Sequence, residues 1–163
     1  MTSSSLRVQV VVDLLKKHEV SNIVFSPGSR NAPLVIGFNG DDYFKSKIIV
    51  DERSAAFFAL GIAQQIQKPV VICSTSGSAV LNYAPAIVEA YYQKIPLLVI
   101  TADRPPEWVN QGEGQSMKQY KVYENYIAKS FNLPMLDHPD ALWQTGVITV
   151  SYTHLRAHET SNH

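Results

Sequence analysis

The sequence predicts an α/β fold in which helices cover both faces of a doubly wound, mostly parallel sheet. Strand-like and helix-like segments alternate at least four times along the chain, which is the pattern of βαβ units. The strand-like runs are continuously apolar, as expected for strands buried on both faces. The chain has 163 residues, 45% hydrophobic and 17% charged, which suits one globular domain.

The amino-terminal half is predicted to contain three helices and two strands. Residues 3–18 form the first helix, because Leu6, Val10 and Leu14 recur at nearly helical spacing after serines that can cap its start. The next segments are short apolar runs separated by turn residues. They are a strand at 22–26, a turn at 26–31, a short helix at 32–38, a strand at 46–50 and a helix at 53–67.

The second half continues this alternation and then becomes irregular. Its predicted elements are a strand at 69–74, TSGSAVLN with a helix that runs to about Gln93, a strand at 96–101, a polar loop at 107–127 that leads to a short helix, a weaker fifth strand at 128–134 and a helix at 138–150. Paired prolines after the fourth strand stop any helix there. We expect residues 1–150 to form the domain.

Residues 151–163 differ from the rest, because they are polar and lack apolar periodicity. His154 and His158 stand four residues apart, with Glu159 adjacent, which is a spacing found in metal-binding helices. A zinc site also needs a third ligand and supporting hydrogen bonds. We therefore expect no metal site here and interpret the segment as a disordered or non-native tail.

Several classes of function are disfavoured by composition and by missing motifs. Fourteen basic residues balance fourteen acidic ones, which leaves no electrostatic footprint for nucleic acid. Cys73, the single cysteine, is expected to be a buried thiol. Dinucleotide, nucleoside-triphosphate and serine-hydrolase motifs are absent. There is neither a secretory signal nor an apolar run of membrane-spanning length, so we expect a cytoplasmic protein.

Polar residues follow each of the first four predicted strands, at 26–31, 51–53, 75–78 and 103–107. Carboxyl ends of parallel strands line the ligand crevice of such a sheet. Any one of the sets could be ordinary turn chemistry, but together they predict a functional rim.

The acidic pair in the second set has two interpretations. Glu52, between a buried strand and a mostly apolar helix, is a candidate for proton transfer with a tuned pKa. Alternatively, Asp51 caps the helix and Glu52 lies favourably in its positive first turn.

The other sets suit anions. Gly28 permits a tight turn or a close backbone approach, Ser29 offers a hydroxyl group, and Arg30 and Arg104 can bind carboxylates or phosphates through planar guanidinium groups. The TSGS segment can hold an anion or a polar ring at a helix start. Solvated arginines in turns and simple helix capping explain these residues about as well when each is taken alone.

Taken together, SPGSRNAPL, DERSAAFFALG, TSGSAVLNYAPAIVEA and TADRPPE resemble a known family over about residues 5–150. They are similar to the amino-terminal pyrimidine-binding domain of the 2-succinyl-5-enolpyruvyl-6-hydroxy-3-cyclohexene-1-carboxylate synthases, thiamine-diphosphate enzymes of menaquinone biosynthesis. The resemblance implies that 2-oxoglutarate is decarboxylated and that the resulting succinyl carbanion adds to isochorismate. It also implies that Glu52 hydrogen-bonds the aminopyrimidine ring of the cofactor, and that Thr75, Ser76 and Gly77 contribute to cofactor binding.

The resemblance further assigns substrate-binding roles to four residues. Ser29, Arg30 and Arg104 match positions that hold substrate carboxylates, and Gln115 matches a glutamine near the substrate. Gly114 departs from the family, which has asparagine at that position.

Family members are several times longer and carry a second domain whose Gly-Asp-Gly…Asn motif holds magnesium and the diphosphate. Here Gly40, Asp41 and Asp42 form the only similar fragment, without the asparagine. We therefore expect an amino-terminal fragment that is inactive alone and that belongs to a homo-oligomeric enzyme (a dimer or tetramer), in which each active site lies between two subunits. The alternatives are another thiamine-diphosphate enzyme, such as a 2-oxo acid decarboxylase or an acetolactate synthase-like protein, and a non-catalytic α/β binding module.

Overall fold

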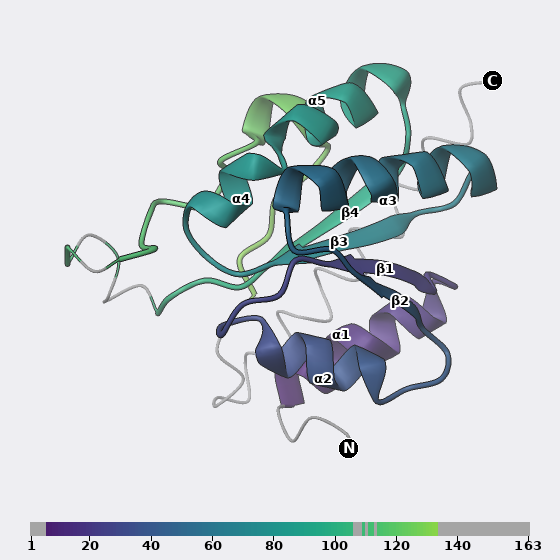
Figure 1. The fold of residues 1–163 in the computed structure, drawn as a ribbon, viewed down its shortest axis with the longest axis horizontal. Coiled ribbons are helices and arrows are strands. Elements are labelled where there is room, and N and C mark those ends of the chain that lie inside the picture. Colours follow the sequence, from purple (N-terminus) through teal and green to yellow (C-terminus); the bar gives the residue numbers. More distant parts are fainter. Residues whose placement is uncertain (1–5, 106–108, 110, 113, 134–163) are drawn as a thin grey trace. The chain divides into compact units, whose positions relative to one another are not determined.

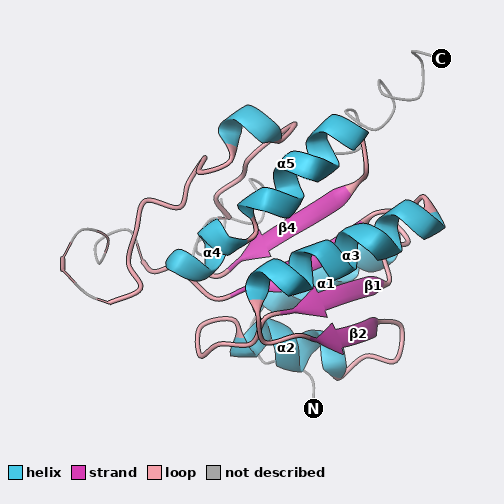
Figure 2. Ribbon diagram, turned by 45° about the horizontal axis from the view of Figure 1, so that its top comes forward, coloured by secondary structure: helices cyan, strands magenta, loops and turns pink. Residues whose placement is uncertain are grey.

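The computed structural model describes residues 6–105, 109, 111–112 and 114–133. These residues form a four-stranded sheet with the order β2-β1-β3-β4. The strands are β1 (Asn22–Phe25), β2 (Lys45–Ile48), β3 (Val70–Ser74) and β4 (Leu97–Thr101). All neighbouring strands are parallel, as Figure 2 shows. The predicted parallel sheet is confirmed.

Helices cover both faces of this sheet, which confirms the doubly wound arrangement (Figure 1). The helices α1 (Leu6–Lys17) and α2 (Ala32–Asn39) lie on one face. The other face carries α3 (Glu52–Ile66), α4 (Ser78–Asn82) and α5 (Ala84–Gln93), and a short 3-10 helix, η2 (Glu124–Tyr126), follows β4.

The two cores of the domain are made by alternate residues of the same strands, which point to opposite faces of the sheet. Val24 and Ile72 pack on the face of α3, whereas Phe25 and Cys73 pack on the face of α1 and α2. Both central strands are therefore apolar except for Asn22 at the start of β1 and Ser74 at the end of β3. Burial raises the pKa of the Cys73 thiol to about 12, so the predicted buried thiol is confirmed.

Two predicted element boundaries and one predicted strand differ from the structure. The strand predicted at 46–50 covers Lys45–Ile48 instead, and Val50 is exposed. The helix predicted to run to Gln93 breaks into α4 and α5 near Tyr83, because Pro85 in the first turn of α5 cannot donate a helical hydrogen bond. Residues 128–133 form no strand, since they are largely exposed and gain little burial from pairing.

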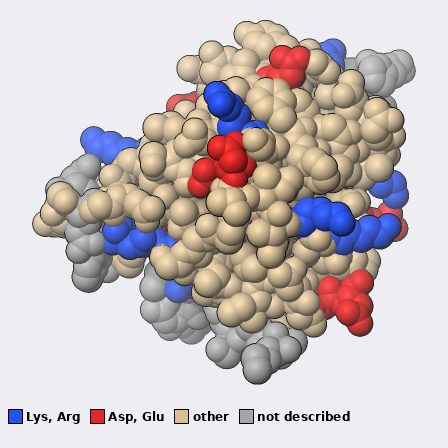
Figure 3. Space-filling model, viewed as in Figure 1, with Lys and Arg blue, Asp and Glu red and all other residues tan. Residues whose placement is uncertain are grey.

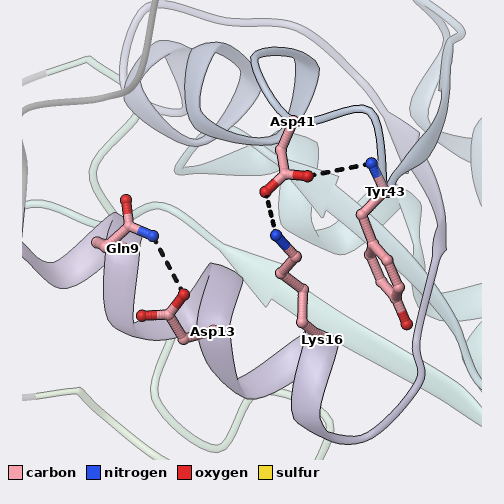
Figure 4. A network of polar contacts seen from close by, with 5 residues as sticks. All are labelled: Gln9, Asp13, Lys16, Asp41 and Tyr43. Carbon is pink, nitrogen blue, oxygen red and sulfur yellow. Dashed lines mark hydrogen bonds and ion pairs between the residues drawn. The ribbon is translucent and has the colours of Figure 1, made fainter.

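The fragment that resembled a diphosphate motif is a structural turn (Figure 4). The Asp41 carboxylate binds the Lys16 ammonium group at 2.6 Å and accepts a hydrogen bond from the Tyr43 N–H at 3.0 Å. The hydrogen bond from Lys16, and then that from the Tyr43 backbone, lower the pKa of Asp41. Asp41 therefore joins α1 to the segment before β2, away from the carboxyl ends of the strands.

The chain divides into two compact units, residues 1–130 and 131–163. The predicted helix at 138–150, the domain boundary at residue 150 and the histidines at 154 and 158 lie outside the described residues and stay predictions. None of the helices in the described part has the length and apolar character required of a membrane span.

Candidate active site

The carboxyl ends of β1 and β3 lie side by side and mark the crevice of the sheet. The two strands pair with Phe25 beside Cys73. The chain leaves β1 towards α2 on one face and leaves β3 towards α4 on the other (Figure 1). Ligands bind to open parallel sheets where connections diverge in this way. Residues 26–31 and 75–77 therefore flank the expected binding crevice.

Asn31 holds the turn after β1, and its side chain is completely buried. Its Oδ1 accepts a hydrogen bond from the Gly28 N–H at 2.7 Å, and its Nδ2 donates to the Ser26 carbonyl oxygen at 2.9 Å. A Cβ atom on Gly28 would lie 2.6 Å from the Thr75 Cβ. The predicted close approach at Gly28 is thus confirmed. Our sequence reasoning assigned no role to Asn31, although asparagine in a Pro-Gly turn is a recognisable signal for such bonding.

A buried hydroxyl pair connects the same turn to the helical face. The Tyr83 hydroxyl donates to Ser26 Oγ at 3.2 Å. Burial raises the pKa of Tyr83, and the charge of Glu52 contributes in the same direction. Tyr83 therefore remains a neutral hydrogen-bond donor at physiological pH, and Glu52 lies close enough for its charge to act on it.

Asp51 and Glu52 have different environments at the start of α3. Asp51 is the N-cap residue, and its Oδ1 accepts a hydrogen bond from the Ser54 N–H at 2.7 Å. Glu52 is half-buried. Its carboxylate makes no hydrogen bond or ion pair with any residue that the structure describes. The structural interpretation is therefore confirmed for both residues, because Asp51 caps α3 and Glu52 lies in its first turn. The Glu52 carboxylate is in addition left available for a ligand.

The capping bond predicts a pH-dependent effect of Asp51→Ala on stability. The hydrogen bond from Ser54 lowers the pKa of Asp51 in the folded state, so its stabilisation is present above the unfolded pKa and is lost as the pH falls through the folded pKa. We expect Asp51→Ala to lower the melting temperature by a few degrees at pH 7 and by less at pH 3. Thermal melts at both pH values test this, with Asp51→Ser as the control that keeps an uncharged cap. An equal loss at both pH values would contradict the assignment.

A second cluster forms at the ends of β3 and β4. The Arg104 guanidinium donates a hydrogen bond to the Gly114 carbonyl oxygen, and the Ser76 hydroxyl donates to the Gln115 carbonyl oxygen at 3.2 Å. The structure thus brings Arg104, the segment at Gln115 and the TSG turn together, as the rim hypothesis requires. The side chain of Gln119, which our sequence reasoning missed, also binds this cluster.

Ser29 and Arg30 lie on the other side of the crevice. Ser29 is exposed and Arg30 is half-buried, immediately before α2. Their turn meets the second cluster through the contact of Gly28 with Thr75. Arg30 follows β1 and Arg104 follows β4, so the two guanidinium groups stand on separate connections of one rim.

This rim leaves polar groups available to a polar ligand. The Thr75 hydroxyl oxygen is buried and has no hydrogen-bond partner in the described part of the chain. The Glu52 carboxylate, at the start of α3, also has no partner among the described residues. Unpartnered buried polar groups of this kind are expected where a polar ligand completes the hydrogen bonding. Within the same part of the chain, no group of three or more His, Cys, Asp and Glu side chains could hold a metal ion.

The sheet order, the helices on both faces and this rim define a doubly wound α/β domain with a candidate ligand site at the carboxyl edge of its sheet. The family described as thiamine pyrophosphate enzyme, N-terminal TPP binding domain, matches residues 7–122, and the chain belongs to this family.

More specific similarity is to the 2-succinyl-5-enolpyruvyl-6-hydroxy-3-cyclohexene-1-carboxylate synthases. The chain is 50% identical over 137 residues to the synthase of Cytophaga hutchinsonii (83% of this chain and 24% of the relative). It is 56% identical over 123 residues to that of Christiangramia forsetii (76% and 21%). The chain thus spans about a quarter of the length of these relatives, and the resemblance predicted from the motifs is confirmed.

Among solved structures, benzoylformate decarboxylase from Polynucleobacter necessarius matches with a TM-score of 0.68 over 80% of this chain and 24% of that chain. The sequence identity of 22% makes this a likeness of fold alone.

Proposed function

We propose that the chain is the pyrimidine-binding part of a thiamine-diphosphate-dependent synthase that decarboxylates 2-oxoglutarate and joins the resulting succinyl unit to isochorismate in menaquinone biosynthesis. The observation that carries the proposal is the half-buried Glu52, whose carboxylate has no partner among the described residues and whose neighbour Asp51 supplies the helix cap. Similarity to the synthases supports the choice of reaction.

When bound, thiamine diphosphate supplies the nucleophilic thiazolium carbon that attacks a 2-oxo acid. In our proposal, Glu52 exchanges a proton with the pyrimidine ring nitrogen, since a half-buried carboxyl group can hold or release one there. In our proposal Thr75, Ser76 and Gly77 lie along the edge of the same ring, and the Thr75 hydroxyl, which has no partner in the described part of the chain, binds it.

We propose that Ser29, Arg30, Arg104 and Gln115 bind the substrates. Both substrates carry two carboxylates, and guanidinium groups bind carboxylates by paired, charge-assisted hydrogen bonds. The half-buried positions of Arg30 and Arg104 on separate connections support a site that holds two anionic partners at once.

Donor choice tests the proposal in the intact protein that carries this chain. With thiamine diphosphate, Mg²⁺ and isochorismate, we expect kcat/KM for 2-oxoglutarate to exceed that for pyruvate by at least about 100-fold, because pyruvate leaves a clamping arginine unpaired. Equal use of pyruvate would instead indicate another thiamine-diphosphate 2-oxo acid decarboxylase or an acetolactate synthase-like enzyme. Cofactor-independent binding without turnover would indicate a non-catalytic module.

We also propose that the Mg²⁺ and the diphosphate are held by a domain absent from this chain, which covers only about a quarter of its relatives. The chain of 163 residues is therefore expected to show no synthase turnover with the same substrates and cofactors. Turnover by this chain alone would contradict the proposed division of the site. The cytoplasm remains our proposed location on sequence grounds alone.

The exposed side of α3 supports the proposed homo-oligomer. Phe57 is 43% and Phe58 47% exposed, and with Ile62 and Ile66 they line a shallow apolar groove. In Figure 3, uncharged residues cover most of the visible face around this helix. Contiguous exposed apolar surface of this kind is typical of subunit contacts.

We predict that Phe58→Glu shifts the intact protein towards smaller species, because a charge placed in an apolar contact is desolvated without a partner. Light scattering after size-exclusion chromatography measures the mass. Ile36→Glu is the matched control, since Ile36 is 50% exposed but lies on α2, on the opposite face of the sheet. An unchanged mass for Phe58→Glu would remove α3 from the subunit contact.

A further inference from the structure

The side chain of Gln119 bridges the ends of two neighbouring strands. Only 7% of it is exposed. Its Oε1 accepts a hydrogen bond from the Gly77 N–H at 2.7 Å, and its Nε2 donates to the Ala102 carbonyl oxygen at 2.9 Å. Gly77 follows β3 and Ala102 follows β4 directly. A neutral amide is the side chain that offers both an acceptor and a donor to two such backbone groups.

The segment carried by Gln119 touches the proposed substrate residues. Gly77 packs so closely on Gln115 that a Cβ atom would lie 2.8 Å from the Gln115 Cα. The Ser76 hydroxyl donates to the Gln115 carbonyl oxygen at 3.2 Å, and Arg104 donates to the Gly114 carbonyl oxygen. Residues 114–119 are thus docked at both ends on the rim.

Gln115 itself has an unusual backbone conformation. Its φ of 57° lies in the left-handed region, which residues other than glycine adopt infrequently and at a cost in free energy. Such a conformation persists only where surrounding contacts enforce it. The contacts with Ser76 and Gly77, and the anchor at Gln119, are the ones that do so here.

We propose that Gln119 is a positioning residue: its amide fixes residues 114–119 on the turn after β3 and on the end of β4, and so sets the placement of Gln115 and Arg104 for substrate carboxylates. Gln119 acts through these residues and does not itself contact a substrate. This inference rests on the proposed function, because that function gives Gln115 and Arg104 their ligands.

Three variants of the intact protein test the positioning role by steady-state kinetics. Gln119→Met keeps the length of the side chain but removes both hydrogen bonds, whereas Gln119→Glu keeps the acceptor for Gly77 and loses the donor to Ala102. For Gln119→Met we expect KM for at least one dianionic substrate to rise about tenfold with kcat within about twofold, the size of effect that the loss of such hydrogen bonds produces. Gln119→Glu places a carboxylate oxygen against the Ala102 carbonyl oxygen at a buried site, so it should raise KM at least as much as Gln119→Met. Gln111→Met, at an exposed site of the same loop, is the matched control and should leave both constants unchanged.

Amide hydrogen exchange on the same variants separates this inference from the proposed function. In Gln119→Met, faster exchange at Gly77 and over residues 114–119 together with the raised KM supports positioning. Faster exchange with an unchanged KM overturns the positioning role. So does a fall in both kcat and stability with an unchanged KM, and either result leaves Gln119 a purely structural residue. If the intact wild-type protein shows no synthase turnover, the proposed function is wrong. If, in addition, exchange is unchanged in Gln119→Met, Gln119 does not hold residues 114–119 on the rim.

Discussion

Replacing Glu52 by glutamine in the intact protein is expected to lower kcat by at least about 100-fold, the lower end of the contribution that a positioned acid or base makes. Glutamine has the shape of glutamate but cannot release or take up the proton that we assign to the pyrimidine ring nitrogen. Because Asp51 supplies the N-cap hydrogen bond to Ser54, the start of α3 should keep its structure in the variant.

The measurement is kcat at saturating 2-oxoglutarate, isochorismate, thiamine diphosphate and Mg²⁺, together with the melting temperature. Asp51→Asn is the matched control: it changes the neighbouring carboxylate and retains an acceptor for the cap, so it should keep near wild-type kcat. We expect Glu52→Gln to lose activity without a loss of melting temperature. Near wild-type turnover for Glu52→Gln would remove this side chain from the mechanism.

The central strands could be predicted from the sequence, and the edges of the sheet could not. In β1 and β3 successive residues pack alternately into the two apolar cores, so the boundaries of the apolar runs nearly coincide with the strands. β2 pairs only with β1 in the described part of the sheet, and its residues are mostly exposed. An apolar run such as IIV therefore does not decide where an edge strand ends. The same ambiguity affects the strand predicted at 128–134, of which residues 128–133 form none.

The residues of the candidate site also fall into two groups, those that the sequence predicts and those that it does not. The locations of Glu52, Thr75 and Arg104 follow from a local rule, because each comes just after a strand and parallel strands share one carboxyl edge. The bonds of Gln119 and Tyr83 depend on contacts with residues 42 and 57 positions away in the chain. No local pattern encodes such pairings, so these two residues emerged only once the fold had brought the segments together.

The second large effect is expected at Gly77, where alanine should destabilise the chain by about 3 kcal/mol. Gly77 has φ 78° and ψ −143°, a region that residues with a Cβ atom rarely adopt. The added Cβ atom would also lie 2.8 Å from both the Cα and the carbonyl oxygen of Gln115. The clash is with backbone atoms, which cannot rotate away as a side chain would, so the strain adds to the cost of the conformation.

Denaturant unfolding of Gly77→Ala measures this loss, and Gly61→Ala is its matched control. Gly61 lies within α3 and has open space where a Cβ atom would be placed, so alanine there should stabilise the chain by up to about 1 kcal/mol through helix propensity. If Gly77→Ala were as stable as the wild type, the docking of Gln115 on this turn would be wrong. The double variant with Gln119→Met sharpens the test: both changes release the same segment, so their effects should sum to less than two independent losses. Fully additive losses would mean that Gly77 and Gln119 hold different parts of the rim.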